Sequence, residues 1–265
     1  MDRSGNRKAE CHSARLPTRL PAPWRLADDV AVLKTGALSA TLRVGDPGQG
    51  LGELAWNGGA VGGRILGVTT HSAPLATGRS RPTAFTRGDD LVASYSVDPQ
   101  QPTSCQIYWR ATPQANGSVV VDTIVSVQTD LLESFPEIVL ETQLASEQLW
   151  SLRPDEARGQ QDDRWHLAEQ TTATGLDVGC LILRPERADW SYAEMTHPDD
   201  RDRWKVQRAD SGQYVMQRRL GGSFLEKGVI RVMRIRGAFL PRADDLHLAE
   251  ECFLALTAAA PPLTA

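Results

Sequence analysis

The chain has 265 residues, of which 41% are hydrophobic and 23% charged, a composition typical of a soluble globular protein with one large domain or two small ones. Its net charge of −4 provides no overall basic field, so nucleic acid is not expected as a partner. No segment approaches the run of about 18 apolar residues that a membrane-spanning helix needs, so no membrane partner is expected either.

The charge is unevenly distributed along the chain. Residues 1–25 contain six basic and two acidic side chains, a net charge of +4, which leaves −8 for the remainder. No long apolar run follows this basic start, so it is not a secretory signal, and Pro17, Pro21 and Pro23 prevent a continuous amphipathic helix. We predict a disordered basic extension over residues 1–27 and a single domain over residues 28–265.

The four cysteines are isolated in the sequence, at Cys11, Cys105, Cys180 and Cys252. Without a CxxC pair, structural zinc is not expected, and scattered cysteines without a signal peptide favour a reducing cytoplasm. A cysteine pair that meets only in the folded chain stays compatible with the sequence.

From residue 29 onward, short β-branched runs alternate with turn residues. Strands are predicted within residues 29–45 (two strands around a turn at Thr35-Gly36), 64–70, 89–98, 104–112, 119–129, 137–144, 165–172, 176–185, 189–196, 203–209, 214–220 and 227–240. Asn116-Gly117 is a strong hairpin signal, and residues 153–164 are predicted to be a polar surface loop. Strands at this spacing without interleaved helices predict an all-β fold, a large antiparallel β-sandwich.

One helix is expected at the end of the chain. Asp244 or Asp245 is suited to the N-cap position, and Pro261-Pro262 is suited to stopping the helix. Apolar residues between these points recur at helical spacing, so one face of the helix is expected to pack on the sheets.

Three stretches of the sequence resemble the galactose mutarotase-like superfamily of carbohydrate-active supersandwich proteins. They are "DVAVLKTGALSATL", "ELAWNGGAVGGRILGV" and "EKGVIRVMRIRGAFLP", and the resemblance covers about residues 28–260. It implies a concave sheet that holds a saccharide and, in epimerase members, a histidine and a late glutamate that open the sugar ring by acid–base chemistry. This chain lacks the family's histidine-centred signatures and its glutamate context. His71, His166 and Glu226 only follow the same chain order.

The strand over residues 227–240 contains three arginines among apolar residues. Alternation places Arg234 and Arg236 on one face and Arg231 on the other. Such arginines either extend to solvent or pair with carboxylates, or they line a wet face that binds the hydroxyls or carboxylate of a sugar acid. Both interpretations remain open from the sequence.

Trp165 and His166 follow one another after the predicted polar loop. They offer an aromatic platform and a general acid or base for a sugar ring, or else Trp165 packs inward and the loop is simply solvated. His71 and His197 lie at strand ends, where an exposed histidine is the ordinary outcome, and no metal site is predicted. Glu137 and Glu141 are expected to share one strand face, which gives little support to glycoside hydrolysis.

The sequence therefore predicts a saccharide-recognising protein, with isomerisation at the anomeric carbon as the expected activity if it is an enzyme. Whether it is an enzyme is open. His166 is the candidate proton donor and Glu226 the candidate base, with Arg231, Arg234, Trp165 and His71 as candidate substrate-binding residues. No cofactor is expected, because acid–base isomerisation needs none. The absence of nucleotide-binding, α/β-hydrolase and zincin motifs disfavours those other classes of enzyme. The alternative is a non-catalytic scaffold that contacts another protein through a sheet face or the Gly-rich loop. The sequence gives no oligomeric state.

Overall fold

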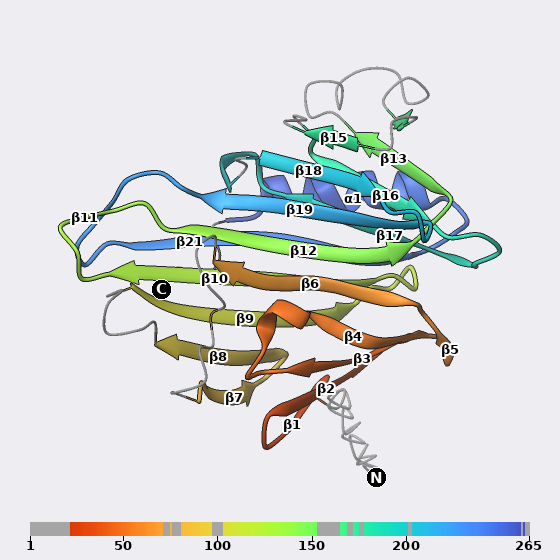
Figure 1. Cartoon of the computed structure of the whole chain (residues 1–265). Coiled ribbons are helices and arrows are strands. Elements are labelled where there is room, and N and C mark those ends of the chain that lie inside the picture. Colours follow the sequence, from red (N-terminus) through yellow and green to blue (C-terminus); the bar gives the residue numbers. More distant parts are fainter. Residues whose placement is uncertain are drawn as a thin grey trace, which may run out of the picture.

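The structure, a computed structural model, describes residues 22–70, 75, 81–96, 103–152, 165–168, 172–174, 178–200, 203–260 and 262. Two large antiparallel sheets lie face to face, and one helix packs on the outer face of the second sheet (Figure 1). The predicted all-β sandwich with a C-terminal helix is therefore confirmed.

The first sheet has ten strands, with the order β1-β2-β3-β4-β6-β12-β19-β18-β15 and β5 paired to β4. Its strands are β1 Trp24–Ala27, β2 Val30–Thr35, β3 Leu38–Arg43, β4 Leu51–Trp56, β5 Gly59–Ala60, β6 Gly63–Thr70, β12 Glu137–Ala145, β15 Thr172–Thr174, β18 Arg203–Arg208 and β19 Gln213–Gly221. A short 3₁₀ turn, η1 at Pro47–Gln49, leads into β4.

The second sheet has nine strands, with the order β14-β13-β16-β17-β21-β10-β9-β8-β7. These are β7 Thr83–Arg87, β8 Asp90–Ser96, β9 Thr103–Pro113, β10 Val119–Thr129, β13 Gln148–Leu152, β14 Trp165–Leu167, β16 Cys180–Arg184, β17 Trp190–Thr196 and β21 Ile230–Pro241. A second 3₁₀ turn, η4 at Pro198–Asp200, follows β17. β21 is the longest strand described, in agreement with the sequence.

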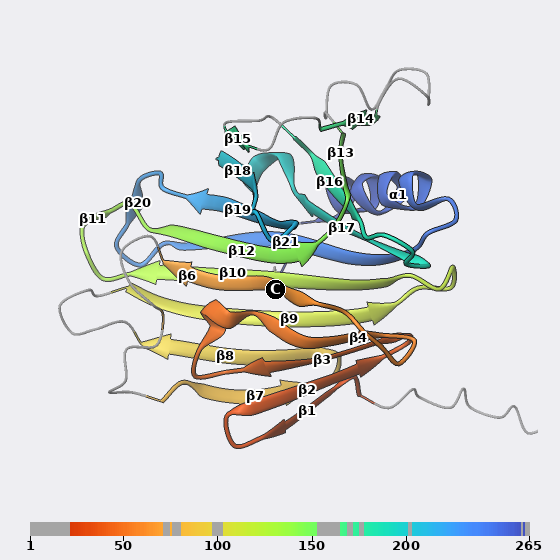
Figure 2. The ribbon, with the colours of Figure 1, turned by 45° about the vertical axis from the view of Figure 1, so that its right-hand side comes forward.

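Two further strands, β11 at Glu133–Ser134 and β20 at Leu225–Glu226, pair only with each other. They join the ends of β10 and β12 and of β19 and β21 and form one end of the molecule (Figure 2).

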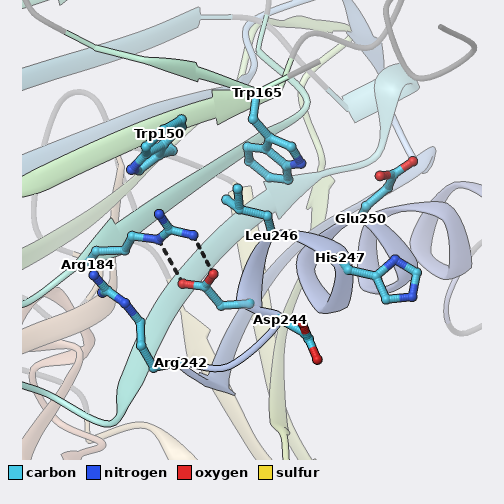
Figure 3. Close-up of a pocket in the computed structure, with 9 residues that line it drawn as sticks. Trp150, Trp165, Arg184, Arg242, Asp244, Leu246, His247 and Glu250 are labelled. Carbon is cyan, nitrogen blue, oxygen red and sulfur yellow. Dashed lines mark hydrogen bonds and ion pairs between the residues drawn. The ribbon is translucent and has the colours of Figure 1, made fainter. Parts of the chain in front are cut away.

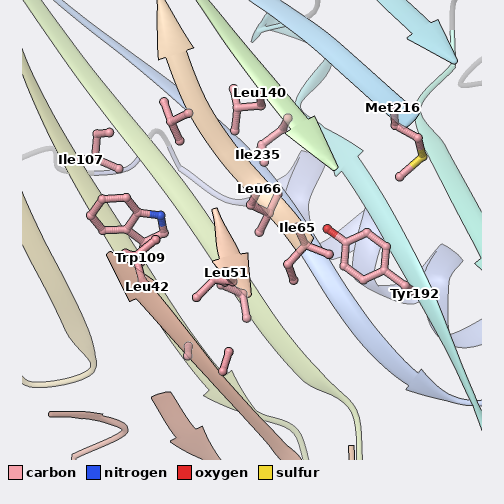
Figure 4. Packing of buried hydrophobic residues seen from close by; sticks show 14 of the residues in the cluster. Leu42, Leu51, Ile65, Leu66, Ile107, Trp109, Leu140, Tyr192, Met216 and Ile235 are labelled. Carbon is pink, nitrogen blue, oxygen red and sulfur yellow. The ribbon is translucent and has the colours of Figure 1, made fainter. Parts of the chain in front are cut away.

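The main core fills the space between the two large sheets. Figure 4 shows part of it, where Ile65 and Leu66 of β6 lie near Tyr192 of β17 and Trp109 of β9. Alternate residues of β12 and β19 are buried, which is the pattern of antiparallel strands with one buried face.

The helix α1, Asp245–Ala258, covers a second and smaller core on the outer face of the nine-stranded sheet. Ala249, Phe253 and Leu256 are buried there against β16, β17 and β21. Asp244 is the N-cap residue by position, as predicted, although its side chain makes no capping hydrogen bond. No helix among the described residues is both long and apolar enough to span a membrane.

Two predicted turns are present. Gly36 (φ 54°) connects β2 to β3, and Gly117 (φ 84°) lies in the hairpin between β9 and β10. Both glycines occupy the left-handed region that a side chain disfavours.

The sheet begins earlier than the sequence indicated. Residues 24–27 form β1 and pair with β2, so the predicted boundary of the extension at residue 27 is wrong. Trp24 is buried in the main core, and this burial offsets the cost of ordering a segment rich in proline and arginine. The predicted extension over residues 1–21 and the polar loop over 153–164 lie outside the described residues.

Candidate functional site

A pocket of about 490 Å³ lies between the start of α1 and strands β13 and β14 of the nine-stranded sheet (Figure 3). We call it the helix pocket. Its walls are Trp150 of β13, Trp165 of β14, Arg184 of β16, Arg242 after β21, and Asp244, Asp245, Leu246, His247 and Glu250 at the beginning of α1. Segments from four places in the sequence meet here, and the last of them is the stretch in which β21 leads directly into the helix that packs across β16 and β17.

One wall of the helix pocket is fixed by a two-point contact between Arg184 and Asp245. Arg184 Nε donates to Asp245 Oδ2 at 2.9 Å, and Arg184 Nη2 donates to Oδ1 at 2.5 Å. The hydroxyl of Ser191 also donates to Oδ2. The Arg184 guanidinium lies 5.0 Å from the ring centre of Trp150. Because both partners are largely buried and the contact is planar, it holds the first turn of α1 in a defined position.

Arg242 is the second arginine of the helix pocket and is bound far less completely. Its Nη1 donates to Ser191 Oγ at 3.4 Å, and its backbone N–H donates to Asp189 O at 2.8 Å. Within the described residues, no carboxylate pairs with Arg242. A guanidinium has five N–H donors, so most of those on Arg242 remain available to a ligand.

Two ionisable side chains of α1 complete the pocket. Glu250 is buried, whereas His247 is half exposed and its Nε2 lies 3.3 Å from Glu251 Oε1 on the next turn. Carboxylate, imidazole and guanidinium groups thus surround a space lined by two indoles. This arrangement suits a polar ring-shaped ligand with several hydroxyl groups.

Of the residues that the sequence proposed for a site, Trp165 lies in the helix pocket and is almost completely buried, at 8% exposure. His166 follows it on β14 and is exposed. Because successive residues of a strand point to opposite faces, the side chain of His166 is directed away from the side on which Trp165 packs. The two neighbours therefore do not serve one pocket.

The three strand arginines have different environments. Arg236 makes a two-point contact with Asp122 of β10, at 2.7 and 2.9 Å, which confirms internal ion pairing for this arginine. Arg234 is buried and donates from Nη2 to the carbonyl of Leu256 near the end of α1, at 3.0 Å. Burial lowers the pKa of Arg234. Both arginines thus hold α1 on the sheet, since Arg236 Nη1 also donates to Cys252 O at 3.4 Å.

Arg231 points to the opposite face, as alternation predicted. It donates to the carbonyl of Ser223 at 3.2 Å and to that of Phe224 at 3.1 Å. Glu226 lies on β20, directly opposite Glu133 of β11. β20 and β14 lie at opposite ends of the molecule (Figure 2), so the structure does not bring Glu226 and His166 together. His71 lies outside the described residues.

A second polar cluster, on the outer face of the ten-stranded sheet, was not singled out as a site from the sequence. Glu141 of β12 is partly exposed and accepts hydrogen bonds from Arg64 (2.6 Å) and Gln143 (2.8 Å) at Oε1 and from Gln217 (2.6 Å) at Oε2. The sequence placed Glu137 and Glu141 on one strand face, but it contains no signal that aligns Arg64 and Gln217 with them. These residues are brought together by pairing of β12 with β6 and β19.

Among the described residues, no group of histidine, cysteine, aspartate and glutamate side chains is arranged to hold a metal ion. Cys105 and Cys180 are buried and unpaired, and Cys252 is partly buried and unpaired.

The sequence matches no protein-family model, and no curated protein is significantly similar to it. Comparison with solved structures identifies the fold class. A protein from Klebsiella pneumoniae provisionally named an aldose 1-epimerase superposes with a TM-score of 0.51 and 9% identity, covering 89% of this chain and 87% of the other. An aldose epimerase homologue from C. elegans gives a TM-score of 0.50 and 9% identity, over 78% of this chain and 97% of the other.

An α-galactosidase from Lactobacillus brevis also matches, with a TM-score of 0.50 and 10% identity over 86% of this chain but only 42% of the galactosidase. At these identities the likeness concerns the fold. The chain thus has the large β-sandwich found in galactose mutarotase-like structures, as the sequence resemblance implied.

Proposed function

We propose that this protein binds a saccharide in the helix pocket. The observation that carries the proposal is the position of Trp150 and Trp165 beside the fixed Arg184–Asp245 pair, within one pocket of about 490 Å³. Sugars present apolar C–H faces and vicinal hydroxyl groups, and protein sites recognise them by pairing aromatic surface with planar polar groups.

Arg242 provides the free hydrogen-bonding capacity that such a ligand needs. Arg184 and Asp245 largely satisfy each other, so they shape the pocket, whereas Arg242 retains most of its donors. Trp150 is the more exposed of the two indoles and is the better contact surface, because Trp165 is already buried. The ligand would therefore lie between Trp150 and Arg242.

The structural neighbours support a sugar ligand through what their names state: two are named for aldose epimerase activity or homology, and one is an α-galactosidase. Isomerisation at the anomeric carbon is the finer part of the proposal. It requires an acid and a base on one sugar, and His247 and Glu250, which both line the helix pocket, are proposed for these roles. Saccharide binding is proposed as the primary function, and isomerisation is proposed as a further step on the bound sugar.

Calorimetric titration and thermal-shift measurements with neutral sugars, amino sugars and uronic acids test the proposal. A saccharide that binds the wild type should bind at least tenfold more weakly to Trp150→Ala and to Arg242→Ala, because each removes one side of the contact. Glu141→Gln is the matched control, since it changes the other polar cluster and leaves the helix pocket intact. Any sugar that binds is then assayed for mutarotation, with His247→Gln and Glu250→Gln as the variants expected to slow it.

Two results would contradict this assignment. If Glu141→Gln abolishes binding and the pocket variants do not, the saccharide site is on the ten-stranded sheet. If no sugar binds, the saccharide function fails, and the scaffold alternative takes its place. That alternative requires an exposed apolar surface, and exposed apolar side chains gather around β11 and β20, as described next.

A further inference from the structure

Exposed apolar side chains are concentrated at one end of the molecule. Nine large apolar residues of the described chain are exposed, and six of them lie in two short segments around β11 and β20. These are Leu131, Leu132, Phe135, Phe224, Val229 and Ile230. We call residues 129–136 and 222–231 the apolar lobe. Figure 2 shows β11 and β20, which lie in these segments, at the left of the view and α1 at the right.

The apolar lobe is held together by specific contacts. The backbone N–H of Gly222 donates to Pro136 O and that of Gly228 donates to Thr129 O, at 2.8 and 2.9 Å. Leu225 is buried and anchors the lobe to the body, while the rings of Phe135 and Phe224 pack 5.9 Å apart on the outside. A fixed lobe that keeps Leu132 79% exposed presents a preformed apolar surface.

The charges of the apolar lobe are divided between its two segments. The first segment contains Asp130 and Glu133 and no basic residue, whereas the second contains Lys227 and Arg231 together with Glu226. Glu133 and Glu226 stand directly opposite each other across the β11–β20 pair, and neither has a cationic partner among the described residues. Like charges in this position repel, so a single copy of the lobe keeps an unfavourable contact that a nearby cation would relieve.

From these observations we propose that the apolar lobe is a self-association surface, and that its occupant is the same lobe of a second copy of this chain. In a two-fold contact the first segment of one copy faces the second segment of its partner, so Asp130 and Glu133 meet the region of Lys227 and Arg231. The apolar side chains of the two lobes then bury each other. A surface that carries both an acidic and a basic segment beside one apolar centre is complementary to itself.

The charge distribution disfavours a membrane as the occupant, because the three carboxylates of the lobe exceed its two basic groups and anionic headgroups would be repelled. A two-fold contact between the lobes would cover the six exposed apolar side chains of each copy. The contact leaves the helix pocket open, so this inference does not depend on saccharide binding.

Sedimentation velocity of the full chain from micromolar to near-millimolar concentration tests the proposal. The wild type should form a dimer, and Leu132→Asp should weaken dimerisation at least tenfold, because it places a charge at the centre of the contact. Leu254→Asp is the matched control, since this leucine is about half exposed on α1, and it should dimerise like the wild type. Thermal unfolding of each variant verifies that it is folded.

Exchanging two charges of the apolar lobe distinguishes a specific dimer contact from non-specific hydrophobic association. Lys227→Glu should weaken the dimer, and the double variant Glu133→Lys/Lys227→Glu should restore it, because the two charges then exchange places across the two-fold axis. A wild type that stays monomeric at every concentration overturns the proposal. It is equally overturned if Leu132→Asp leaves the dimer intact, or if the wild type sediments with phosphatidylcholine vesicles but does not self-associate.

Discussion

Arg218 of β19 and Glu194 of β17 form an ion pair inside the sandwich, with Arg218 Nε 3.4 Å from Glu194 Oε1 and both side chains almost fully buried. Arg218 Nη2 donates to the carbonyl of Glu194 at 3.1 Å, and the guanidinium lies over the ring of Trp204. Glu194 Oε2 also accepts hydrogen bonds from Thr142 (2.6 Å) and Tyr192 (3.0 Å). The pair connects the two sheets, because β19 belongs to one and β17 to the other.

Removing one partner of this pair should be costly. Arg218→Met leaves a buried carboxylate without its cation and should lower the free energy of unfolding by about 3–5 kcal/mol. The double variant Arg218→Met/Glu194→Leu should recover most of that loss, because no buried charge remains. Urea denaturation of the wild type and both variants measures this. Equal stability of the two variants would show that the charge of Glu194 is already compensated without Arg218.

The pair also predicts a dependence on pH. Burial raises the pKa of Glu194, and the positive charge of Arg218 is the strongest influence that opposes the rise. A carboxyl whose folded pKa is raised gains a proton on folding, so the cost of its ionisation is present above the folded pKa and disappears as pH falls through it. The stability deficit of Arg218→Met should therefore shrink at weakly acidic pH. Denaturation curves of this variant and the wild type across that range measure the difference, and a deficit that grows on acidification would contradict the argument.

The buried cysteines should be unreactive in the folded protein. Burial raises the pKa of Cys105 to about 12, and burial also raises the pKa of Cys180. Since only thiolates react readily, iodoacetamide at about pH 8 should label neither residue until the chain unfolds. Cys252 is less buried and should be labelled more quickly than these two. Mass spectrometry of digested samples taken over time measures each site, and rapid native labelling of Cys105 would show that the core around it opens readily.

The Arg184–Asp245 contact should determine how firmly α1 is docked. Asp245→Asn removes the negative charge that receives two guanidinium donors and one hydroxyl, and should lower the free energy of unfolding by about 2–4 kcal/mol. Hydrogen exchange should become faster in the amides of α1, with little change in β10 and β21. Unchanged protection of α1 would show that the apolar contacts of the helix and its hydrogen bonds from Arg234 and Arg236 are enough to hold it in place.

The hairpin glycine at position 117 provides a test of backbone strain. Gly117 has φ 84°, and a Cβ atom added there would lie 3.6 Å from its nearest neighbour, which is an ordinary contact. Gly117→Ala should therefore lower the free energy of unfolding by about 1 kcal/mol through backbone conformation alone. Gly52→Ala is the control, because Gly52 lies outside the left-handed region and has open space around it. It should be neutral or slightly stabilising in thermal unfolding. Similar losses of thermal stability in both variants would mean that exposure of the added methyl group, rather than the backbone angle φ, controls the change in stability.

The local features of this fold were readable from the sequence. Asn116-Gly117 and Thr35-Gly36 mark their hairpins because only a few residues accept the required backbone angles. The alternation in residues 227–240 correctly separated Arg231 from Arg234 and Arg236, since a strand has a fixed period of two. The helix at Asp245–Ala258 followed from its periodic apolar residues and the prolines after it.

The candidate site was much less readable. Trp165, a candidate substrate-binding residue from the sequence, lines the helix pocket, and its role there stays a prediction. The sequence offers no signal for Arg184 and Arg242, because each stands alone at the end of an apolar strand. The pairing of His166 with Glu226 rested only on chain order, and the structure places them at opposite ends. Glu141 meets Arg64 across 77 positions of sequence, a separation that no local pattern encodes.

The sequence by itself determined which segments form strands, turns and the helix, and which side chains share one face of a strand or helix. It could do so because hydrophobic period, turn chemistry and capping act over a few neighbouring residues. Only the tertiary structure decided the partners of its charged groups. Asp122 and Arg236 are 114 positions apart and stand opposite each other because β10 pairs with β21 in one particular register. A charge within an apolar strand can extend to solvent, bind a ligand or meet a counter-ion, and strand pairing selects among these outcomes by bringing distant side chains within hydrogen-bond distance.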